Sequence, residues 1–259
     1  MKTFNVFITG ATSGIGLGIA KILASEGHQI AYNGIAGLEE TIAISEKLTD
    51  LGATSVHYFD ADMRDGEAIR KMIVIAEKTM GPIDVLVNNA GIQHVAPIEK
   101  FLVAKWDDVI AINLTAHFHT IASVIEGMRS RCFGRIINIA SVHGLVASAN
   151  KSAYVSAKHG VVGLTKTVAL ECATDGITVN AICPGWVNTP LVESQIHVRS
   201  EMSGRSFEEE SSLLIQERQP SQTFVTPEQI GKLCLYLMSE AAASVTGMAI
   251  PIDGAWTAQ

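Results

Sequence analysis

Short apolar runs alternate with longer amphipathic stretches along the first half of the chain. Four runs have the length of a strand: Phe4–Ile8, Gln29–Tyr32, Ser55–Phe59 and Ile83–Val87. Three stretches with helical spacing separate them: Leu17–Ser25, Leu38–Leu51 and Glu67–Met80. Strand, helix and strand repeated in this way predict a parallel sheet, and continuously apolar strands indicate helices on both faces.

The pattern continues into the second half with three further strand candidates: Arg135–Ala140, Thr178–Ile182 and Met248–Ile252. The sequence therefore predicts an α/β protein with a doubly wound parallel sheet of about seven strands. A chain of 259 residues is long enough for one large domain or two small ones. Because no repeat, low-complexity tract or linker interrupts it, we expect residues 1–259 to form a single domain.

One region breaks the rhythm of strands and helices. Residues 188–223 contain no strand candidate, are rich in serine and carry the acidic run Glu208–Glu210. This composition predicts a helical insertion after the sixth strand, and such an insertion beside a binding crevice commonly acts as a lid. The alternative is a solvated helical excursion with no gating role.

Composition and charge limit the classes of partner. Hydrophobic residues make up 47% of the chain and charged residues only 17%, against about 25% charged in an average soluble domain. The chain can therefore bury a large core and keep apolar surface for oligomerisation. The net charge of -7 and the absence of a basic run argue against binding to nucleic acid or an anionic membrane.

No segment predicts a membrane span or a secretion signal. The uncharged windows Val109–Ile125 and Gly176–Val192 are shorter than the ~20 residues of a spanning helix, and Gly10 interrupts the first apolar run. We therefore expect a cytoplasmic protein. The four cysteines form no C-x-x-C pair, so reduced thiols are expected.

The first strand is followed at once by the loop Thr9-Gly10-Ala11-Thr12-Ser13-Gly14-Ile15-Gly16 and then by a helical pattern. Glycines at these positions let the backbone turn tightly and approach a pyrophosphate, which is stabilised by the positive end of the following helix. Taken by itself, this loop could instead be a tight turn that binds no ligand.

Three further motifs follow later strands: Asn88-Asn89-Ala90-Gly91, Ser141, and Tyr154-x-x-x-Lys158. Together with the G-x-x-x-G-x-G loop, they resemble the short-chain dehydrogenase/reductase family over the whole chain. The resemblance implies a Rossmann-like fold, a nicotinamide dinucleotide cofactor and a homotetramer. It assigns cofactor binding to Gly10, Ser13, Gly14, Ile15, Gly16, Asp62, Asn89, Ala90, Gly91, Tyr154, Lys158 and Val187.

The second strand ends at Tyr32-Asn33-Gly34, where NAD-specific members of the family usually place an Asp. An NADP enzyme requires Arg or Lys near Asn33–Gly37 or in the glycine loop, and both stretches have none. NAD is therefore favoured because a partner for the 2′-phosphate is missing. Asp62 matches the family residue that contacts adenine, although an Asp that simply starts a loop would look the same.

Tyr154 and Lys158 lie one helical turn apart, with Asn150 and Ser152 as candidate caps of that helix. Lowering the pKa of a Tyr from ~10 to ~7 takes roughly 4 kcal/mol. A nearby ammonium, the helix end and an oxidised nicotinamide supply charges of the required sign. The family resemblance assigns catalysis to Asn113, Ser141, Tyr154 and Lys158, with Ser141 positioning the substrate oxygen and Asn113 anchoring a proton relay.

A narrower resemblance, in the stretches 90–94, 134–154, 183–187 and 253–259, is to the bacterial branch of the family that oxidises (R)-3-hydroxybutyrate to acetoacetate with NAD. A definite cation, Lys151, and a potential one, His143, flank Ser141 and Tyr154, as suits a small carboxylate. The resemblance assigns substrate binding to Gln93, Ser141, His143, Lys151, Tyr154, Trp186 and Gln195. Taken singly, Lys151, His143 and Gln195 could equally be ordinary surface or loop residues.

Two other functions are compatible with the sequence. A ketoacyl reductase shares the fold but should prefer NADP and carry a basic patch for an acidic carrier. A non-catalytic dinucleotide sensor tends to lose the catalytic Tyr or Lys, and both are here. His117 and His119 point apart on a helix and have no other ligand at metal spacing, so they are interpreted as packing residues and no metal site is predicted.

Overall fold

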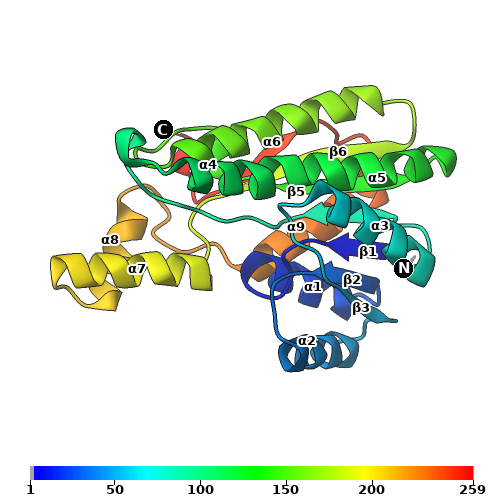
Figure 1. The fold of residues 1–259 in the computed structure, drawn as a ribbon, viewed down its shortest axis with the longest axis horizontal. Helices are drawn as coiled ribbons and strands as arrows, with labels where there is room; N and C mark the ends of the chain where they lie inside the picture. Colours follow the sequence, from blue (N-terminus) through cyan, green and yellow to red (C-terminus); the bar gives the residue numbers. More distant parts are fainter. Residues whose placement is uncertain (1–2, 259) are drawn as a thin grey trace.

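The computed structural model describes residues 3–258 and has a seven-stranded parallel sheet at its centre (Figure 1). The strands are β1 (Asn5–Ile8), β2 (Gln29–Asn33), β3 (Val56–Phe59), β4 (Val85–Asn88), β5 (Gly134–Ile139), β6 (Ile177–Pro184) and β7 (Ala249–Ile252). Their order is β3-β2-β1-β4-β5-β6-β7, and every pairing is parallel. The predicted doubly wound sheet is therefore confirmed, with the change of direction between β1 and β4.

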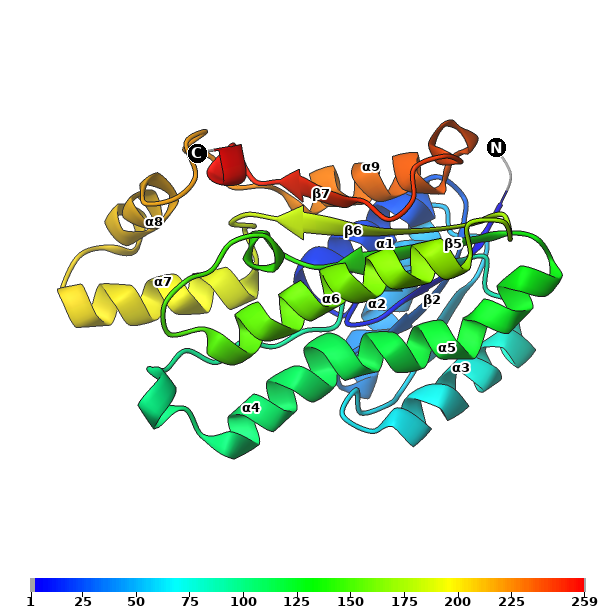
Figure 2. The ribbon, with the colours of Figure 1, turned by 90° about the horizontal axis from the view of Figure 1, so that it is seen from above.

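Helices cover both faces of the sheet (Figure 2). One face carries α1 (Gly14–Ser25), α2 (Leu38–Asp50) and α9 (Pro227–Met238). The other carries α3 (Gly66–Met80), α5 (Ala116–Ser130) and α6 (Ser152–Glu171). Side chains alternate between these two cores, since Val6 and Ile8 pack into the first and Phe7 into the second. This double burial explains why the strands are continuously apolar.

Helix α1 begins at Gly14, three residues before the expected start at Leu17. Ser13 has extended backbone angles and forms the N-terminal boundary, so the last glycines of the loop belong to the first helical turn. The sequence pattern missed this turn because its glycines carry no apolar side chain that would show helical periodicity.

A long helix runs across the second face: α4 (Val103–Ile110), the π-helical turn η2 (Ala111–Thr115) and α5 are continuous. Among the described residues, Val103–Ser130 is the one helix with the length and apolar composition of a membrane span. The helix is longer than the uncharged window Val109–Ile125 because it also includes charged residues near both ends. It packs against α3 and α6 as part of the helical layer.

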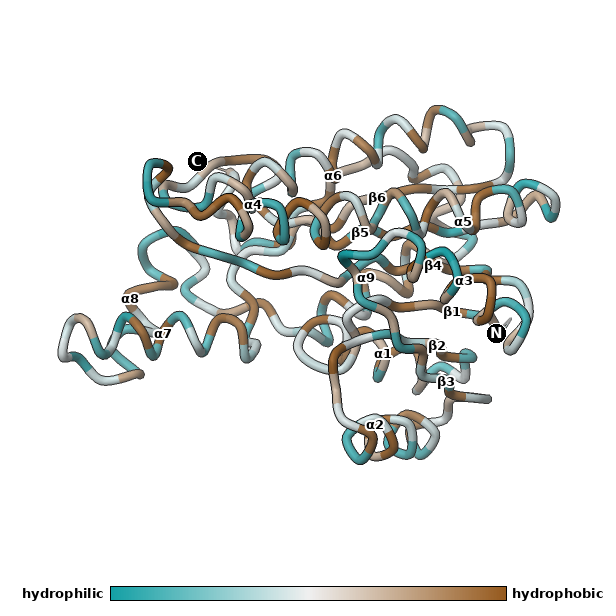
Figure 3. The backbone as a smooth tube through the Cα atoms, in the orientation of Figure 1, coloured by the Kyte–Doolittle hydropathy of each residue, from teal (hydrophilic) through white to brown (hydrophobic). Residues whose placement is uncertain are grey.

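Residues 190–216 form a helical pair, α7 (Pro190–Ser203) and α8 (Phe207–Gln216), which projects beyond the carboxyl edge of the sheet (Figures 1 and 2). Hydrophobic and hydrophilic segments are mixed along it (Figure 3). Val192, Ile196 and Leu214 form a small core of their own. The buried carboxylate of Glu210 is ion-paired with Arg199 at 2.9 Å and Arg205 at 3.0 Å.

The remaining elements are short. Single turns of 3-10 helix lie at η1 (Ile98–Lys100), η3 (Val142–Gly144), η4 (Glu240–Ala242) and η5 (Trp256–Ala258). Two of these turns position pocket residues, because η3 follows β5 with His143 and η5 follows β7 with Trp256.

Candidate active site

The loop between β1 and α1 lies against the end of β4 and leaves no space for a side chain at Gly10 or Gly16. Gly10 and Gly14 have φ of 64° and 54°, values that favour glycine. A Cβ on Gly10 would lie 2.7 Å from the Cα of Ala90, and one on Gly16 would collide with the carbonyl of Gly10. The predicted roles of these glycines in a tight backbone turn therefore have a geometric basis.

Thr9 and Asn89 brace this loop from inside. The Thr9 hydroxyl accepts hydrogen bonds from the backbone N–H groups of Asn89 (2.9 Å) and Ala90 (3.0 Å). The Asn89 amide donates in return to the carbonyls of Thr9 (3.0 Å) and Gly10 (2.9 Å). Asn89 therefore holds the loop in shape, and sequence reasoning missed its partner Thr9.

The start of α1 fits the diphosphate of a dinucleotide. Ser13 makes no side-chain capping hydrogen bond, and the first turn carries no acidic residue. Its backbone N–H groups are therefore available to an anion, which the helix dipole also favours. Ile15 and Val187 line the pocket described below, so that pocket adjoins this helix start.

At the adenosine end expected from the sequence, Asn33 is buried and donates to the carbonyls of Phe59 (3.1 Å) and Ala61 (3.2 Å). The Asp62 carboxylate forms a bidentate ion pair with Arg64, and the shortest distance, from Nη2 of Arg64 to Oδ2 of Asp62, is 2.6 Å. Hydrogen bonds from Arg64 lower the pKa of Asp62. Asp62 is thus a partner of Arg64, which the sequence analysis did not consider.

Tyr154 and Lys158 lie on α6, beside Ser141 at the end of β5. The Lys158 ammonium lies 5.7 Å from the centroid of the Tyr154 ring and donates to the carbonyl of Ile139 at 2.7 Å. Burial lowers the pKa of Lys158 to about 8. The Ser141 hydroxyl accepts from the backbone N–H of His143 at 3.1 Å and has a hydrogen-bonding interaction with Tyr154.

One expectation about α6 is not met by the chain alone, and another, the identity of its cap, is wrong. Burial raises the pKa of Tyr154, and the interaction with Ser141 opposes that rise only in part. The chain alone therefore does not lower the pKa of Tyr154. The residue at the N-terminal boundary of α6 is Lys151 rather than Asn150 or Ser152, and no side chain caps the helix. Asn150 instead has a positive φ of 65° in the preceding turn.

Asn113 is fully buried in the π-helical turn η2. Its Oδ1 accepts from the backbone N–H of Ile92, and its Nδ2 donates to the Ile92 carbonyl, both at 2.8 Å. Asn113 therefore clamps the segment after β4 that leads to Gln93. Neither Asn113 nor Lys158 lines the pocket.

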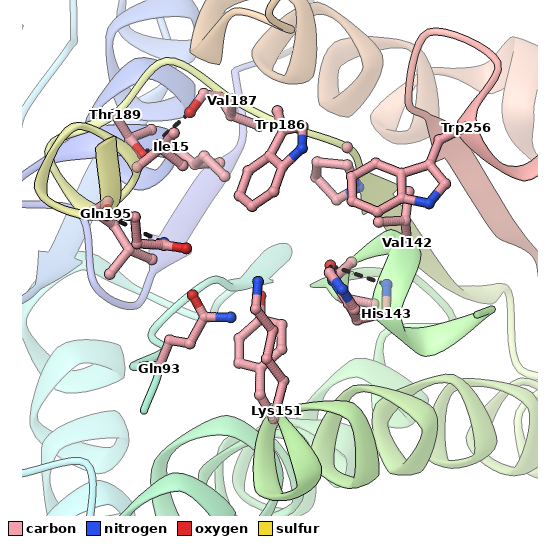
Figure 4. A pocket seen from close by; sticks show the side chains of 17 residues that line it. Ile15, Gln93, Val142, His143, Lys151, Trp186, Val187, Thr189, Gln195 and Trp256 are labelled. Atoms are coloured by element: carbon pink, nitrogen blue, oxygen red, sulfur yellow. Dashed lines mark hydrogen bonds between the residues drawn. The ribbon is translucent and has the colours of Figure 1, made fainter. Parts of the chain in front are cut away.

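A pocket of about 80 Å³ lies at the carboxyl edge of β5 and β6, beside the start of α7 (Figure 4). All seven residues that the sequence analysis assigned to substrate binding line it: Gln93, Ser141, His143, Lys151, Tyr154, Trp186 and Gln195. They come from five separate segments of the chain. The structure therefore brings together every predicted substrate-binding residue.

Lys151 extends into the pocket below Trp186, with Gln93 and Gln195 to one side (Figure 4). Its Nζ lies 4.9 Å from the centroid of the Trp186 ring. Among residues 3–258, no carboxylate lies within ion-pair distance of it. Burial lowers the pKa of Lys151 to about 8, so at neutral pH the pocket contains a cation without a protein counter-ion.

His143 is not the second cation that the sequence suggested. Burial, together with the charge of Lys151, lowers its pKa to about 4, so the ring is neutral at pH 7. Its Nε2 lies 2.7 Å from the Ser148 hydroxyl, and its Nδ1 lies 3.4 Å from that of Ser141. His143 is therefore a neutral hydrogen-bonding group beside Ser141.

The sequence analysis missed Trp256, Thr189, Leu191 and Val192 as lining residues. Trp256 is the largest of them. The centroid of its ring lies 5.7 Å from that of Trp186 and 5.5 Å from that of His143. The signal in the sequence was weak, since a Trp followed by only three residues predicts no contact by itself. His117 and His119 do point apart: the former is buried, and the latter contacts Arg70 at 2.8 Å.

Comparison with known proteins identifies the class. Residues 5–199 match the family model described as short chain dehydrogenase, and the chain belongs to that family. It is an oxidoreductase with a nicotinamide dinucleotide as its cofactor, which agrees with the loop and the helix start described above.

Two curated relatives are similar over nearly their whole length. The chain is 51% identical over 253 residues to a D-beta-hydroxybutyrate dehydrogenase of Cupriavidus necator, covering 97% of each protein. It is 48% identical over 257 residues to a D-beta-hydroxybutyrate dehydrogenase of Rhizobium meliloti, covering 99% of this chain and 100% of the relative. Among solved structures, actinorhodin polyketide ketoreductase with NADPH matches with a TM-score of 0.92 at 36% identity, covering 98% of this chain and 97% of the other.

Proposed function

We propose that this protein catalyses the reversible, NAD-dependent oxidation of (R)-3-hydroxybutyrate to acetoacetate. The observation that carries the proposal is the unpaired ammonium of Lys151 in the same small pocket as Ser141 and Tyr154. A buried cation without a counter-ion favours an anionic ligand, because a substrate carboxylate supplies the missing charge. The naming of the two relatives supports the same substrate.

Polar groups at one end of the pocket suit the carboxylate. Lys151 supplies the charge, and the side-chain amides of Gln93 and Gln195 supply further N–H donors. The rings of Trp186 and Trp256 form an apolar wall next to them. A pocket of about 80 Å³ fits a four-carbon acid better than a long acyl chain.

At the other end, Tyr154 accepts the proton of the substrate hydroxyl and Ser141 positions its oxygen. A nicotinamide dinucleotide held by the glycine loop and the start of α1 would supply the hydride acceptor for C3 and, in its oxidised form, a positive charge that favours ionisation of Tyr154. Lys158 stabilises the phenolate through its nearby ammonium, and the family resemblance also assigns it to the cofactor ribose. His143, being neutral, hydrogen-bonds with Ser141 without adding charge.

Asn113 anchors a proton relay behind Lys158. The π-helical turn around it replaces the regular hydrogen bonds with a wider bond, from the Ala116 N–H to the carbonyl of Ala111. Such turns change the hydrogen bonding of nearby carbonyls and are frequent at functional sites. The clamp of Asn113 on Ile92 keeps this turn next to the segment that carries Gln93.

The preference for NAD rests on the end of β2. A Cβ at Gly34 would lie 2.5 Å from the Thr12 hydroxyl, so this position has no space for a basic side chain. The nearby Arg64 is neutralised by Asp62 and lies 3.6 Å from Asp108. The remaining contacts assigned to the cofactor, from Ser13, Ala90 and Gly91, follow from the family resemblance alone.

Residues 188–223 act as a lid within a single catalytic domain. Gln195 on α7 reaches the pocket, and its Nε2 currently donates to the carbonyl of Leu191 on its own helix at 3.2 Å. This weak local bond is readily exchanged for one to a carboxylate. The ion pairs of Glu210 keep α7 and α8 together, so the pair can close as one unit.

A homotetramer completes the proposal. Apolar side chains are exposed on the outer helices, among them Phe118 on α5 and Leu170 on α6, which is 80% exposed. Exposed apolar side chains on long helices suit two-fold interfaces between copies. Light scattering at micromolar concentration should give four times the mass of the chain, and a monomer would contradict this part of the proposal.

The function is tested by following NADH absorbance with NAD or NADP against both enantiomers of 3-hydroxybutyrate, simple secondary alcohols, sugars and a ketoacyl thioester. We expect the (R)-acid with NAD to give the highest kcat/KM. Preference for the thioester with NADPH would favour a ketoacyl reductase. Tight dinucleotide binding without turnover of any substrate would favour a sensor.

A further inference from the structure

The two ends of the segment 188–223 meet in a short parallel ladder. Val187 pairs with Val225, the Val225 N–H donates to the Trp186 carbonyl at 2.9 Å, and the Asn188 N–H donates to the Val225 carbonyl at 3.2 Å. In a regular parallel ladder the next bond would run from the Trp186 N–H to the carbonyl of Thr223. That direct bond is not made here.

The side-chain amide of Gln219 is inserted between those two groups. Its Oε1 accepts from the Trp186 N–H at 2.9 Å, and its Nε2 donates to the carbonyl of Thr223. A primary amide has the same donor and acceptor as a peptide group, so the ladder continues through the side chain. Gln219 is fully buried, so water does not replace either bond if the amide is removed.

Glycines on both sides make room for this side chain. A Cβ on Gly185 would lie 2.5 Å from the Oε1 of Gln219, and one on Gly254 would lie 2.7 Å from its Cγ. Gly254 also has a positive φ of 56° and accepts from the Ser221 N–H at 3.0 Å. Gln219 is therefore packed between the loop that carries Trp186 and the loop that carries Trp256.

Both tryptophans contact the predicted carboxylate end of the pocket. Lys151 lies under the Trp186 ring, and the Trp256 ring packs on Trp186 and His143. Any shift of the Trp186 backbone thus moves the surface on which the Lys151 ammonium lies.

We propose that Gln219 is a positioning residue: its amide fixes the backbone of Trp186 and thereby the wall that orients Lys151 towards the substrate carboxylate. This inference rests on the proposed function for the identity of the substrate. It concerns a residue that touches neither substrate nor reacting atoms, and it predicts an effect on recognition of the acid rather than on proton transfer.

The variants are chosen to separate the amide from its volume. Gln219→Leu keeps much of the size and removes both hydrogen bonds. Gln219→Glu keeps an acceptor for the Trp186 N–H but places an oxygen against the Thr223 carbonyl. The matched control is Gln216→Leu, because Gln216 is exposed at the end of α8 and lies only three residues earlier.

We expect Gln219→Leu to raise KM for (R)-3-hydroxybutyrate by roughly tenfold or more, while kcat falls by less than about threefold. KM for the uncharged butan-2-ol should change by less than about twofold, because that substrate does not need Lys151. Gln219→Glu should be intermediate, and Gln216→Leu should match the parent. Equal losses for the acid and the alcohol would overturn the inference.

A second readout does not depend on the substrate. In a Trp106→Phe background, the emission of the folded protein comes from Trp186 and Trp256 alone. We expect Gln219→Leu and Gln219→Glu to shift or quench this emission relative to Gln216→Leu. Unchanged emission in folded Gln219 variants would overturn the inference. If circular dichroism shows that Gln219→Leu does not fold, the kinetic and emission results of Gln219→Glu decide whether the inference holds.

The two proposals fail in different ways. If the parent enzyme does not oxidise 3-hydroxybutyrate, the proposed function is wrong. The emission of the Gln219 variants still tests whether Gln219 positions Trp186. If the parent oxidises the acid and the Gln219 variants behave like Gln216→Leu, the function stands and the role of Gln219 is wrong.

Discussion

The ammonium of Lys151 lies 4.9 Å from the centre of the Trp186 ring. An aromatic face stabilises a cation but does not neutralise it, so the pair retains a positive charge in the pocket. Burial lowers the pKa of Lys151 to about 8, which shows that the charge is held at an energetic cost. Binding of a carboxylate relieves that cost, which makes this pair the most informative place to test the function.

The first prediction concerns pH. Since burial lowers the pKa of Lys151 to about 8, the cation is present below that pH and lost above it. Acetate serves as an unreactive carboxylate inhibitor. Its inhibition constant should be constant well below pH 8 and should rise above pH 8, approaching an increase of about tenfold per pH unit, the limit for loss of one proton. Inhibition constants measured from pH 6.5 to 9.5 check this.

Lys158 also has a pKa lowered to about 8, so a control variant is needed. In Lys151→Met, acetate should bind weakly at every pH, with little of the dependence left. If the variant keeps the full pH dependence, the titrating group is not Lys151.

The second prediction separates the carboxylate from the rest of the substrate. A hydrogen bond to a charged group contributes about 1.5–3 kcal/mol, so Lys151→Ala should lower kcat/KM for 3-hydroxybutyrate by roughly ten- to a hundredfold. The value for butan-2-ol should change far less. Steady-state kinetics with both substrates check this, and proportional losses would mean that Lys151 supports the fold instead.

Gln195→Ala extends this prediction to the lid. If the contact with the carboxylate also drives closure of α7, the variant should lower kcat as well as raise KM, because an open lid leaves water around the reacting centre. A change in KM alone would indicate that Gln195 binds the substrate without closing the lid.

The sheet and the motifs at its edge were predictable because each depends on local chemistry. Continuous apolar runs mark strands buried on both faces, and the close approach of Gly10 to Ala90 requires a residue without a side chain. The parallel order then brings the motifs to one edge whatever the details of packing. The family resemblance assigned Ser141, Tyr154 and Lys151 to one site, and their positions after β5 and at the start of α6 bring them to the same pocket.

What could not be predicted depends on partners far apart in the sequence or on burial. Trp256 reaches His143 only through the order of β7 beside β6. The neutral state of His143 follows from its burial, which cannot be read from the sequence. The ion pair of Asp62 with Arg64 was not predicted, because nothing in the sequence shows that the Arg64 side chain turns back onto Asp62.

The third prediction concerns cofactor choice. NAD should exceed NADP in kcat/KM by at least about tenfold, or about 1.4 kcal/mol. Ile35, which is 98% exposed beyond the end of β2, is the position where a basic residue could be added without a clash. Ile35→Arg should therefore lower the ratio of kcat/KM with NAD to kcat/KM with NADP, mainly through a lower KM for NADP. Equal efficiency with both cofactors in the parent enzyme would contradict the prediction.

The last prediction tests the general base. Tyr154→Phe removes the oxygen that accepts the substrate proton and keeps the ring beside Lys158, so turnover should fall by at least about a hundredfold. The dissociation constant of NADH, measured by fluorescence titration, should stay within about threefold, because the variant leaves Gly10, Gly14 and the start of α1 unchanged.

The pH profile of the residual activity supplies the control for this variant. Burial raises the pKa of Tyr154 in the chain alone, so ionisation of the phenol depends on the cofactor charge and on Lys158. The parent enzyme should therefore lose oxidation activity as the pH falls and the phenol stays protonated, and Tyr154→Phe should not show that loss. A variant that binds NADH poorly but keeps its chemistry, or one with the parent's pH profile, would show that another group accepts the proton.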